Sequence, residues 1–293
     1  MSNTDIIIFS KQRTLQLKSL LRSIAHYSDI AEEEMTVLYT TSPEIPYDTL
    51  KSEFACRFIQ DSTFLNDLRN IVEDSKNDYV FFMVDDLIYR EEFSLRRIET
   101  FLDENPDIDC VTPALGRNIT GLGRRARDLQ QPGFSIRDGE FLVWDTAPGL
   151  GVVWNYFWGQ TSYIYRKDLV LKYLLKCDPG KQTFPNPLES FYYSCMPTHH
   201  RGGPFLKRTA VRFRFLLARK TNRMACFERS KGFGQGVNLV ALRGIDHAQL
   251  FEPSELHRKM EEGYIIDFRS LEKVENTWHH PGPQYFKLAK DGQ

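Results

Sequence analysis

The sequence predicts an α/β fold in which a mostly parallel central sheet is flanked by helices. Over residues 1–115, short runs of β-branched and aromatic residues alternate with amphipathic segments, which is typical of successive βαβ units. The strongest strand signal is the apolar run at residues 78–84 (DYVFFMV), which ends abruptly at two aspartates. A chain of 293 residues with 41% hydrophobic and 13% aromatic residues can also bury a large core.

Each expected element follows from its apolar periodicity. Residues 5–9 (DIIIF) form a buried strand, and residues 14–25 carry leucine and isoleucine at helical spacing. Further strands are expected at 35–39, 55–59, 78–84 and 108–112, and further helices at 63–74 and 91–104. After a glycine- and arginine-rich surface loop at 116–133, strands are expected at 140–144, 152–158 and 264–268, and helices at 166–175, 188–195 and 253–262.

The bulk composition restricts the functional classes. A formal charge of −1, from 38 basic and 39 acidic residues, gives no overall electrostatic attraction to nucleic acid or to a membrane. Five scattered cysteines without a CxxC pair favour a reducing compartment. The first residues contain only a short apolar run and no signal-peptide cleavage site. We therefore expect a soluble, cytoplasmic protein that does not bind nucleic acid.

Two adjacent carboxylates, Asp85 and Asp86, directly follow the strongest strand. Open α/β sheets bind their ligands at the carboxyl ends of strands. Adjacent carboxylates repel each other, and a hard divalent cation such as Mn²⁺ or Mg²⁺ relieves that repulsion and can bridge to a diphosphate. The alternative is that Asp85 caps the next segment and Asp86 is solvated.

Four segments stand in a characteristic order: SKQRTLQLKSLLRSI after the first strand, then TVLYTTS, NDYVFFMVDD and WGQTSYIYRKDLV. Over roughly residues 4–195 this order resembles GT-A glycosyltransferases, in particular family-two-like enzymes of bacterial surface-polysaccharide synthesis. The resemblance implies that a sugar moves, with inversion, from a nucleoside-diphosphate sugar to a hydroxyl of a glycan or lipid-linked glycan. It also implies one GT-A domain over residues 1–293, with a nucleotide-sugar-binding half at 1–115 and an acceptor-binding half and tail at 116–293.

The same resemblance implies a donor site. Its residues are Phe9, Ser10, Lys11, Arg13, Asp61, Asp85, Trp158 and Gly159. Lys11 and Arg13 are expected at phosphate, Asp85 near the ribose, and Trp158 against the sugar face. Alternatively, Lys11 and Arg13 are solvated first-turn residues and Trp158 packs in the core.

A metal ligand and a general base complete the implied site. Asp86 is expected to bind the metal, with a late histidine, His257 or His247, as a further ligand; Leu87 departs from the strict Asp-x-Asp pattern. Inverting transfer needs a base for the acceptor hydroxyl. Glu189, at the start of a predicted helix, stands at the matching position, and Asp145 is a competing base. Ordinary helix N-terminal charge is the alternative for Glu189.

Two later segments carry cations, and the first of them contains no acidic residue. Residues 201–223 are interpreted as a surface for an anionic lipid-linked acceptor, with peripheral association at the inner membrane face, or alternatively as an amphipathic element. The glycine-rich run at 229–238 is expected to be a mobile loop over the donor phosphates.

Two other functions compete with glycosyl transfer. A sugar nucleotidyltransferase shares the fold but opens with a glycine-rich loop, whereas FSKQRT contains no glycine. A non-catalytic module of a polysaccharide assembly complex would not require Asp85, Asp86 and Glu189.

Overall fold

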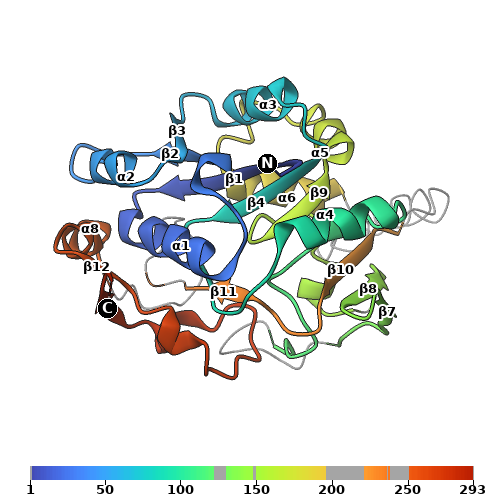
Figure 1. The fold of residues 1–293 in the computed structure, drawn as a ribbon. Coiled ribbons are helices and arrows are strands. Elements are labelled where there is room, and N and C mark those ends of the chain that lie inside the picture. Colours follow the sequence, from blue (N-terminus) through green and yellow to red (C-terminus); the bar gives the residue numbers. More distant parts are fainter. Residues whose placement is uncertain are drawn as a thin grey trace, which may run out of the picture.

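The computed structural model describes residues 2–121, 130–147, 150–195, 221–235, 237 and 251–292. Within these residues a nine-stranded sheet forms the centre, in the order β3-β2-β1-β4-β9-β6-β10-β8-β7. Helices cover both faces of the sheet (Figure 1). The predicted α/β class, with a mostly parallel sheet flanked by helices, is confirmed.

The first half alternates strands and helices as predicted. Its elements are β1 (Thr4–Lys11), α1 (Thr14–Tyr27), β2 (Met35–Thr40), α2 (Asp48–Glu53), β3 (Arg57–Gln60), α3 (Phe64–Asp74) and β4 (Tyr79–Val84). β1 pairs in parallel with β2 and β4, and β2 pairs in parallel with β3. Their carboxyl ends therefore meet at one edge of the sheet, which we call the carboxyl edge.

The second half mixes strand directions. Its elements are β5 (Leu87–Tyr89), α4 (Leu95–Glu104), β6 (Cys110–Val111), β7 (Ser135–Arg137), β8 (Phe141–Asp145), β9 (Tyr163–Arg166), α5 (Lys167–Leu174), α6 (Pro185–Cys195), β10 (Arg223–Phe227), β11 (Gly232–Gly234), α8 (Pro253–Glu261), β12 (Tyr264–Ile266) and β13 (Leu288–Lys290). β9 is antiparallel to β4 and β6; β10 is parallel to β6 and antiparallel to β8. Residues just before β9 thus lie at the carboxyl edge, and the end of β8 lies at the opposite edge.

Side chains of β1 alternate between two cores, one on each face of the sheet. Ile6 and Ile8 pack in a cluster with α1, α2, α4 and α8. Ile7 and Phe9 pack in the other cluster with α3, α5 and α6. Each fully buried aliphatic side chain contributes about 1.5–3 kcal/mol to folding, so a strand that is buried on both faces has a continuous apolar sequence.

Two predicted elements are wrong. Residues 152–158 do not form a strand, because Val152–Asn155 is a short 3-10 helix. Alternating aromatic residues imitated a strand there, and Trp144 Nε1 donates to the Trp154 carbonyl at 2.8 Å instead. The expected mobile loop at 229–238 contains β11, which pairs with β5. A Cβ on Gly232 would lie 2.5 Å from the Ile88 carbonyl oxygen, so close strand pairing requires this glycine.

Other expectations fall outside the described residues. The basic segment at 201–223 lies there up to residue 220, as does His247. The single-domain division at residue 115 stays a prediction.

Candidate active site

Arg13 joins the two adjacent carboxylates at the carboxyl edge. It lies between the end of β1 and the start of α1, and Asp85 and Asp86 follow β4. Arg13 Nη1 lies 3.1 Å from Asp85 Oδ1 and 2.9 Å from Asp86 Oδ2. The parallel pairing of β1 with β4 brings these residues together, although more than seventy positions separate them in the chain. The structure therefore confines Arg13 to the carboxylates rather than leaving it solvated.

Asp85 organises the loop that follows β1. Its Oδ2 accepts hydrogen bonds from Ser10 Oγ and from the Lys11 backbone N–H, both at 3.0 Å. Ser10 Oγ also lies 2.7 Å from the hydroxyl of buried Tyr47. Burial raises the pKa of Asp85 to about 6, although the nearby Arg13 guanidinium acts in the opposite direction. Both oxygens of this buried carboxylate are bonded within the protein, so Asp85 is a positioning group.

Of the other residues expected to bind the nucleotide, Asp61 and Lys11 lie at the carboxyl edge, whereas the Phe9 ring does not. Asp61 directly follows β3, and its backbone N–H donates to the Tyr39 carbonyl at 2.8 Å. Burial is the largest cause of its raised pKa, and the Lys11 charge opposes that rise. Asp61 and Lys11 thus share the carboxyl edge. Phe9 does not present its ring there, because the ring packs against Phe64 and Phe82 in the core.

Glu189 lies in α6 and reaches the segment before β9. Its Oε2 accepts from the Tyr156 hydroxyl and its Oε1 from the Gln160 backbone N–H, both at 2.9 Å. Burial raises its pKa to about 7, and the charge of Asp86 acts in the same direction. The side chain is surrounded by protein yet keeps partial exposure. A carboxylate with a pKa near neutrality is suited to accept a proton from a substrate hydroxyl.

Asp145 does not lie with these residues. It ends β8 at the opposite edge of the sheet and forms an exposed ion pair with Arg223, at 2.8 Å between Oδ1 and Nε. The expectation that Asp145 is a competing base at this site is therefore wrong, because β8 runs against β4.

Trp158 and Gly159 lie in the segment between the 3-10 helix and β9. The Trp158 ring is 1% exposed and packs against Tyr165 and Tyr173, with ring centroids 5.0 and 4.0 Å away. These contacts favour the core role over sugar stacking. Gly159 is tightly enclosed as well, since a Cβ there would lie 2.3 Å from the Tyr163 ring.

Of the two adjacent carboxylates expected at the metal, Asp86 is the more open to solvent, with a side-chain exposure of 23% against 5% for Asp85. Within the described part of the chain, no three His, Cys, Asp or Glu side chains form a metal-ligating cluster. His257 Nδ1 lies 2.9 Å from Thr14 Oγ1, at the first turn of α1. Mg²⁺ is commonly held by one or two protein carboxylates together with substrate phosphates and water. The partly exposed Asp86 side chain fits that arrangement. His257 contacts the first turn of α1 through one ring nitrogen, and its role as a metal ligand stays a prediction.

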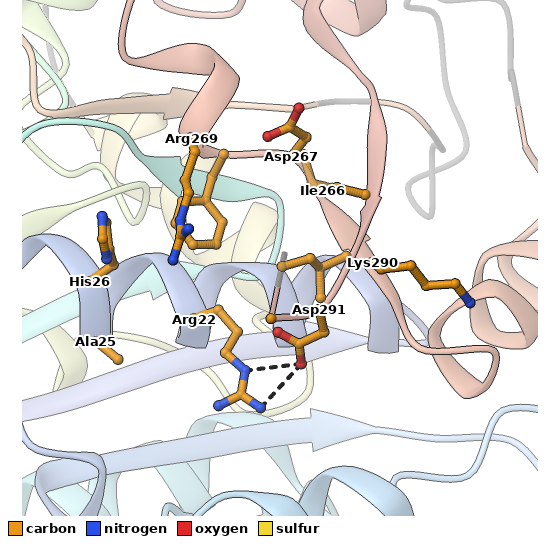
Figure 2. A pocket seen from close by; sticks show the side chains of 12 residues that line it. Arg22, Ala25, His26, Ile266, Asp267, Arg269, Lys290 and Asp291 are labelled. Atoms are coloured by element: carbon orange, nitrogen blue, oxygen red, sulfur yellow. Dashed lines mark hydrogen bonds and ion pairs between the residues drawn. The ribbon is translucent and has the colours of Figure 1, made fainter.

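A groove of about 470 Å³ lies elsewhere, between the second half of α1 and the antiparallel pair of β12 and β13 (Figure 2). Arg22 in its wall donates to Asp291 through Nε and Nη2, at 3.2 and 3.1 Å. Arg13 and Arg22 are nine positions apart, which places the groove more than two helical turns from the carboxylate pair. The groove contains none of the predicted site residues.

Sequence reasoning missed three residues of the site. Tyr47 lies in a loop whose sequence carries no signal for a contact with Ser10. Tyr156 lies in the predicted strand 152–158, whose alternating aromatic residues favour core packing, whereas its hydroxyl donates to Glu189. Gln160 follows the Trp-Gly turn and was not singled out.

Comparison with known proteins gives one sequence relative. No family model matches the chain. The bifunctional glycosyltransferase pgtA of Dictyostelium discoideum is 31% identical over 180 residues, which cover 55% of this chain and 23% of that protein. The chain therefore matches less than a quarter of the length of this curated relative.

Solved structures give more distant similarities. S. aureus TarS (residues 1–349) has a TM-score of 0.46 at 13% identity, covering 80% of this chain and 60% of that one. A cytidylyltransferase from Leptospira borgpetersenii has a TM-score of 0.38 at 13% identity, covering 66% and 73%. TM-scores under 0.5 carry no argument about function. The sequence match stands without them: over 180 residues this chain is similar to a glycosyltransferase.

Proposed function

We propose that this chain is a glycosyltransferase that moves a sugar from a nucleoside-diphosphate sugar to a hydroxyl of a glycan or lipid-linked glycan. One observation carries the proposal: the carboxyl edge holds one carboxylate paired with an arginine and a second carboxylate whose pKa is raised. Asp86 is bonded to Arg13, and Glu189 has a pKa of about 7 that the Asp86 charge helps to raise. The sequence match to a glycosyltransferase supports it independently.

Glu189 is the proposed general base. It takes the proton from the acceptor hydroxyl as that oxygen attacks the sugar carbon, and inversion follows from attack opposite the leaving diphosphate. The hydrogen bonds from Tyr156 and from the Gln160 backbone hold the carboxylate in place. Both donors also stabilise the charged form and keep the pKa from rising further.

Asp86 is the residue that would hold Mn²⁺ or Mg²⁺. The Asp85, Asp86 and Arg13 charges sum to one net negative charge, which disfavours a diphosphate. A divalent cation there would neutralise the diphosphate as it leaves. Lys11, the last residue of β1, is the protein cation proposed to assist at phosphate, while Asp61 is proposed near the nucleobase.

Membrane association is a separate proposal. No helix in the described part of the chain is long and apolar enough to cross a membrane. Peripheral association through the basic segment 201–223, and cytoplasmic localisation, stay predictions.

The direct test is release of nucleoside diphosphate from a panel of UDP, GDP, CDP and dTDP sugars, measured with and without Mn²⁺. We expect one nucleotide class to be turned over, with water as a slow acceptor when no glycan is supplied. Pyrophosphate-dependent conversion of a nucleotide sugar into nucleoside triphosphate and sugar 1-phosphate would instead identify a nucleotidyltransferase. Absence of both reactions with every donor and acceptor glycan tested would favour a non-catalytic module.

A further inference from the structure

Gln160 is a buried amide without a side-chain partner. It is 1% exposed, and neither Nε2 nor Oε1 has a hydrogen-bond partner in the described structure. Its backbone, in contrast, is fixed by the bond to Glu189. Gln160 precedes Tyr163 of β9 by three positions, just as Asp85 follows its partner Phe82 of β4 by three. It therefore lies at the carboxyl edge beside the proposed base.

Gln235 repeats this arrangement beside the other carboxylate. It is fully buried, and both polar atoms of its side chain lack a partner within the described residues. Its backbone N–H donates to the Asp86 carbonyl at 2.6 Å, directly after β11. Pairing of β11 with β5 anchors it there, through the register Gly234 to Leu87.

Two such amides at one edge need an explanation, because each unsatisfied buried polar atom costs about 1–3 kcal/mol. Native proteins keep few of them, and those that persist have a cause such as strain, a catalytic role, or a bound water or ion. An amide offers a donor and an acceptor together. A sugar hydroxyl also donates and accepts, so vicinal hydroxyls of a pyranose match an amide pair.

We propose that Gln160 and Gln235 read hydroxyl groups of the transferred sugar. The transferred sugar must lie between the diphosphate at Asp86 and the acceptor oxygen at Glu189, and one amide is anchored at each of these residues. Sugar binding uncovers the two amides by a local movement and supplies the hydrogen bonds that the free protein lacks. The pair selects a neutral, polyhydroxylated sugar; this inference rests on the proposed function.

Gln182 provides a matched control. It is 5% exposed, but its Oε1 accepts from the Asp178 backbone N–H at 2.7 Å. Each of the variants Gln160→Leu, Gln235→Leu and Gln182→Leu therefore removes one buried side-chain amide. Only the amide of Gln182 has a hydrogen-bond partner in the described part of the free protein.

The experiment measures calorimetric affinities for UDP and UDP-glucose, GDP and GDP-mannose, and dTDP and dTDP-glucose, with melting temperatures of the free proteins. Gln160→Leu and Gln235→Leu should weaken binding of the recognised nucleotide sugar about tenfold or more and leave its nucleoside diphosphate unchanged. Their melting temperatures should equal or exceed the wild-type value by about 2 °C. Gln182→Leu should lower the melting temperature by about 2–4 °C and leave the sugar affinity unchanged.

The opposite pattern overturns the inference. If the two site variants melt below the wild type and bind the nucleotide sugar as tightly as the wild type does, both amides are structural. If the wild type binds no nucleotide or nucleotide sugar, the proposed function itself fails. If the wild type binds them and both site variants bind equally well, only the inference fails.

Discussion

The two edges of the central sheet carry the same residue types in opposite electrostatic settings. At the carboxyl edge, burial raises the pKa of Asp85 to about 6 and that of Glu189 to about 7. At the opposite edge, hydrogen bonds from Arg137, and then from Arg223, hold the pKa of Asp107 well below its usual range. Carboxylates with raised pKa values concentrate at functional sites, whereas exposed ion pairs are mostly structural. The two edges therefore differ in the burial and the partners of their carboxylates, and not in residue type.

The largest difference between the edges is expected in kcat when a carboxylate is replaced by its amide at each edge. Glu189→Gln removes the proton acceptor and should lower kcat by about 10²–10⁴-fold, with donor affinity nearly unchanged. Asp145→Asn changes a carboxylate at the opposite edge and should alter kcat by less than about twofold. Initial rates of nucleoside diphosphate release measure both. Equal rates for the Glu189 variant and the wild type would remove Glu189 from the mechanism.

Removal of an arginine should lower the free energy of unfolding more at the carboxyl edge than at the opposite edge. Arg13→Ala leaves Asp85 buried without its guanidinium, and breaking a buried pair in this way costs about 3–5 kcal/mol. Urea unfolding measures the change. A loss below about 1 kcal/mol would show that Asp85 does not depend on Arg13 in the folded protein.

The pH dependence sharpens the comparison at Glu189. Because the base must be ionised and its pKa is about 7, kcat should rise with pH through a midpoint at about 7 and level off about one pH unit above it. The same raised pKa means that the folded protein holds a proton that the unfolded chain releases. The stability from this group is therefore fully present below the unfolded pKa and is lost as the pH rises through about 7.

Tyr156 supplies the control for that profile. Its hydroxyl stabilises the ionised carboxylate, so Tyr156→Phe should move the midpoint of the kcat profile to higher pH. A midpoint that does not move would assign the titration to another group.

The smallest effect is expected at the opposite edge. Arg223→Ala removes exposed ion pairs with Asp107 and Asp145, each worth about 0.2–1 kcal/mol. Chemical denaturation should show a small, salt-sensitive loss and unchanged turnover. A loss as large as that of Arg13→Ala would erase the distinction between the edges.

Local signals predicted most of the fold. β1 and β4 are buried on both faces, and such strands have continuous apolar sequences that periodicity detects. The adjacent Asp85 and Asp86 stood out because they end such a strand. The false strand at 152–158 arose because Trp154, Tyr156 and Trp158 alternate as in a strand, whereas a short 3-10 helix at Val152–Asn155 and the irregular segment after it place their rings.

The placement of the site depended on long-range pairing that sequence does not display. Asp145 could be excluded only once β8 was known to run against β4. Arg13 could be assigned to both carboxylates only through the pairing of β1 with β4. The rings of Phe9 and Trp158, which were expected to contact the donor, pack against Phe82 and Tyr165 instead. Such contacts between residues distant in the chain are not visible in the sequence.

The most direct test of the account is a thermal-shift screen of the wild type, Asp86→Ala and Asp145→Ala against UDP, GDP, CDP and dTDP sugars, with Mn²⁺ and with chelator. A ligand at about 100 times its dissociation constant stabilises the fold by about 2.7 kcal/mol. We predict a Mn²⁺-dependent shift with one nucleotide class that Asp86→Ala abolishes and Asp145→Ala keeps. No shift with any donor, or an equal shift in both variants, would contradict a nucleotide-sugar site at the carboxyl edge.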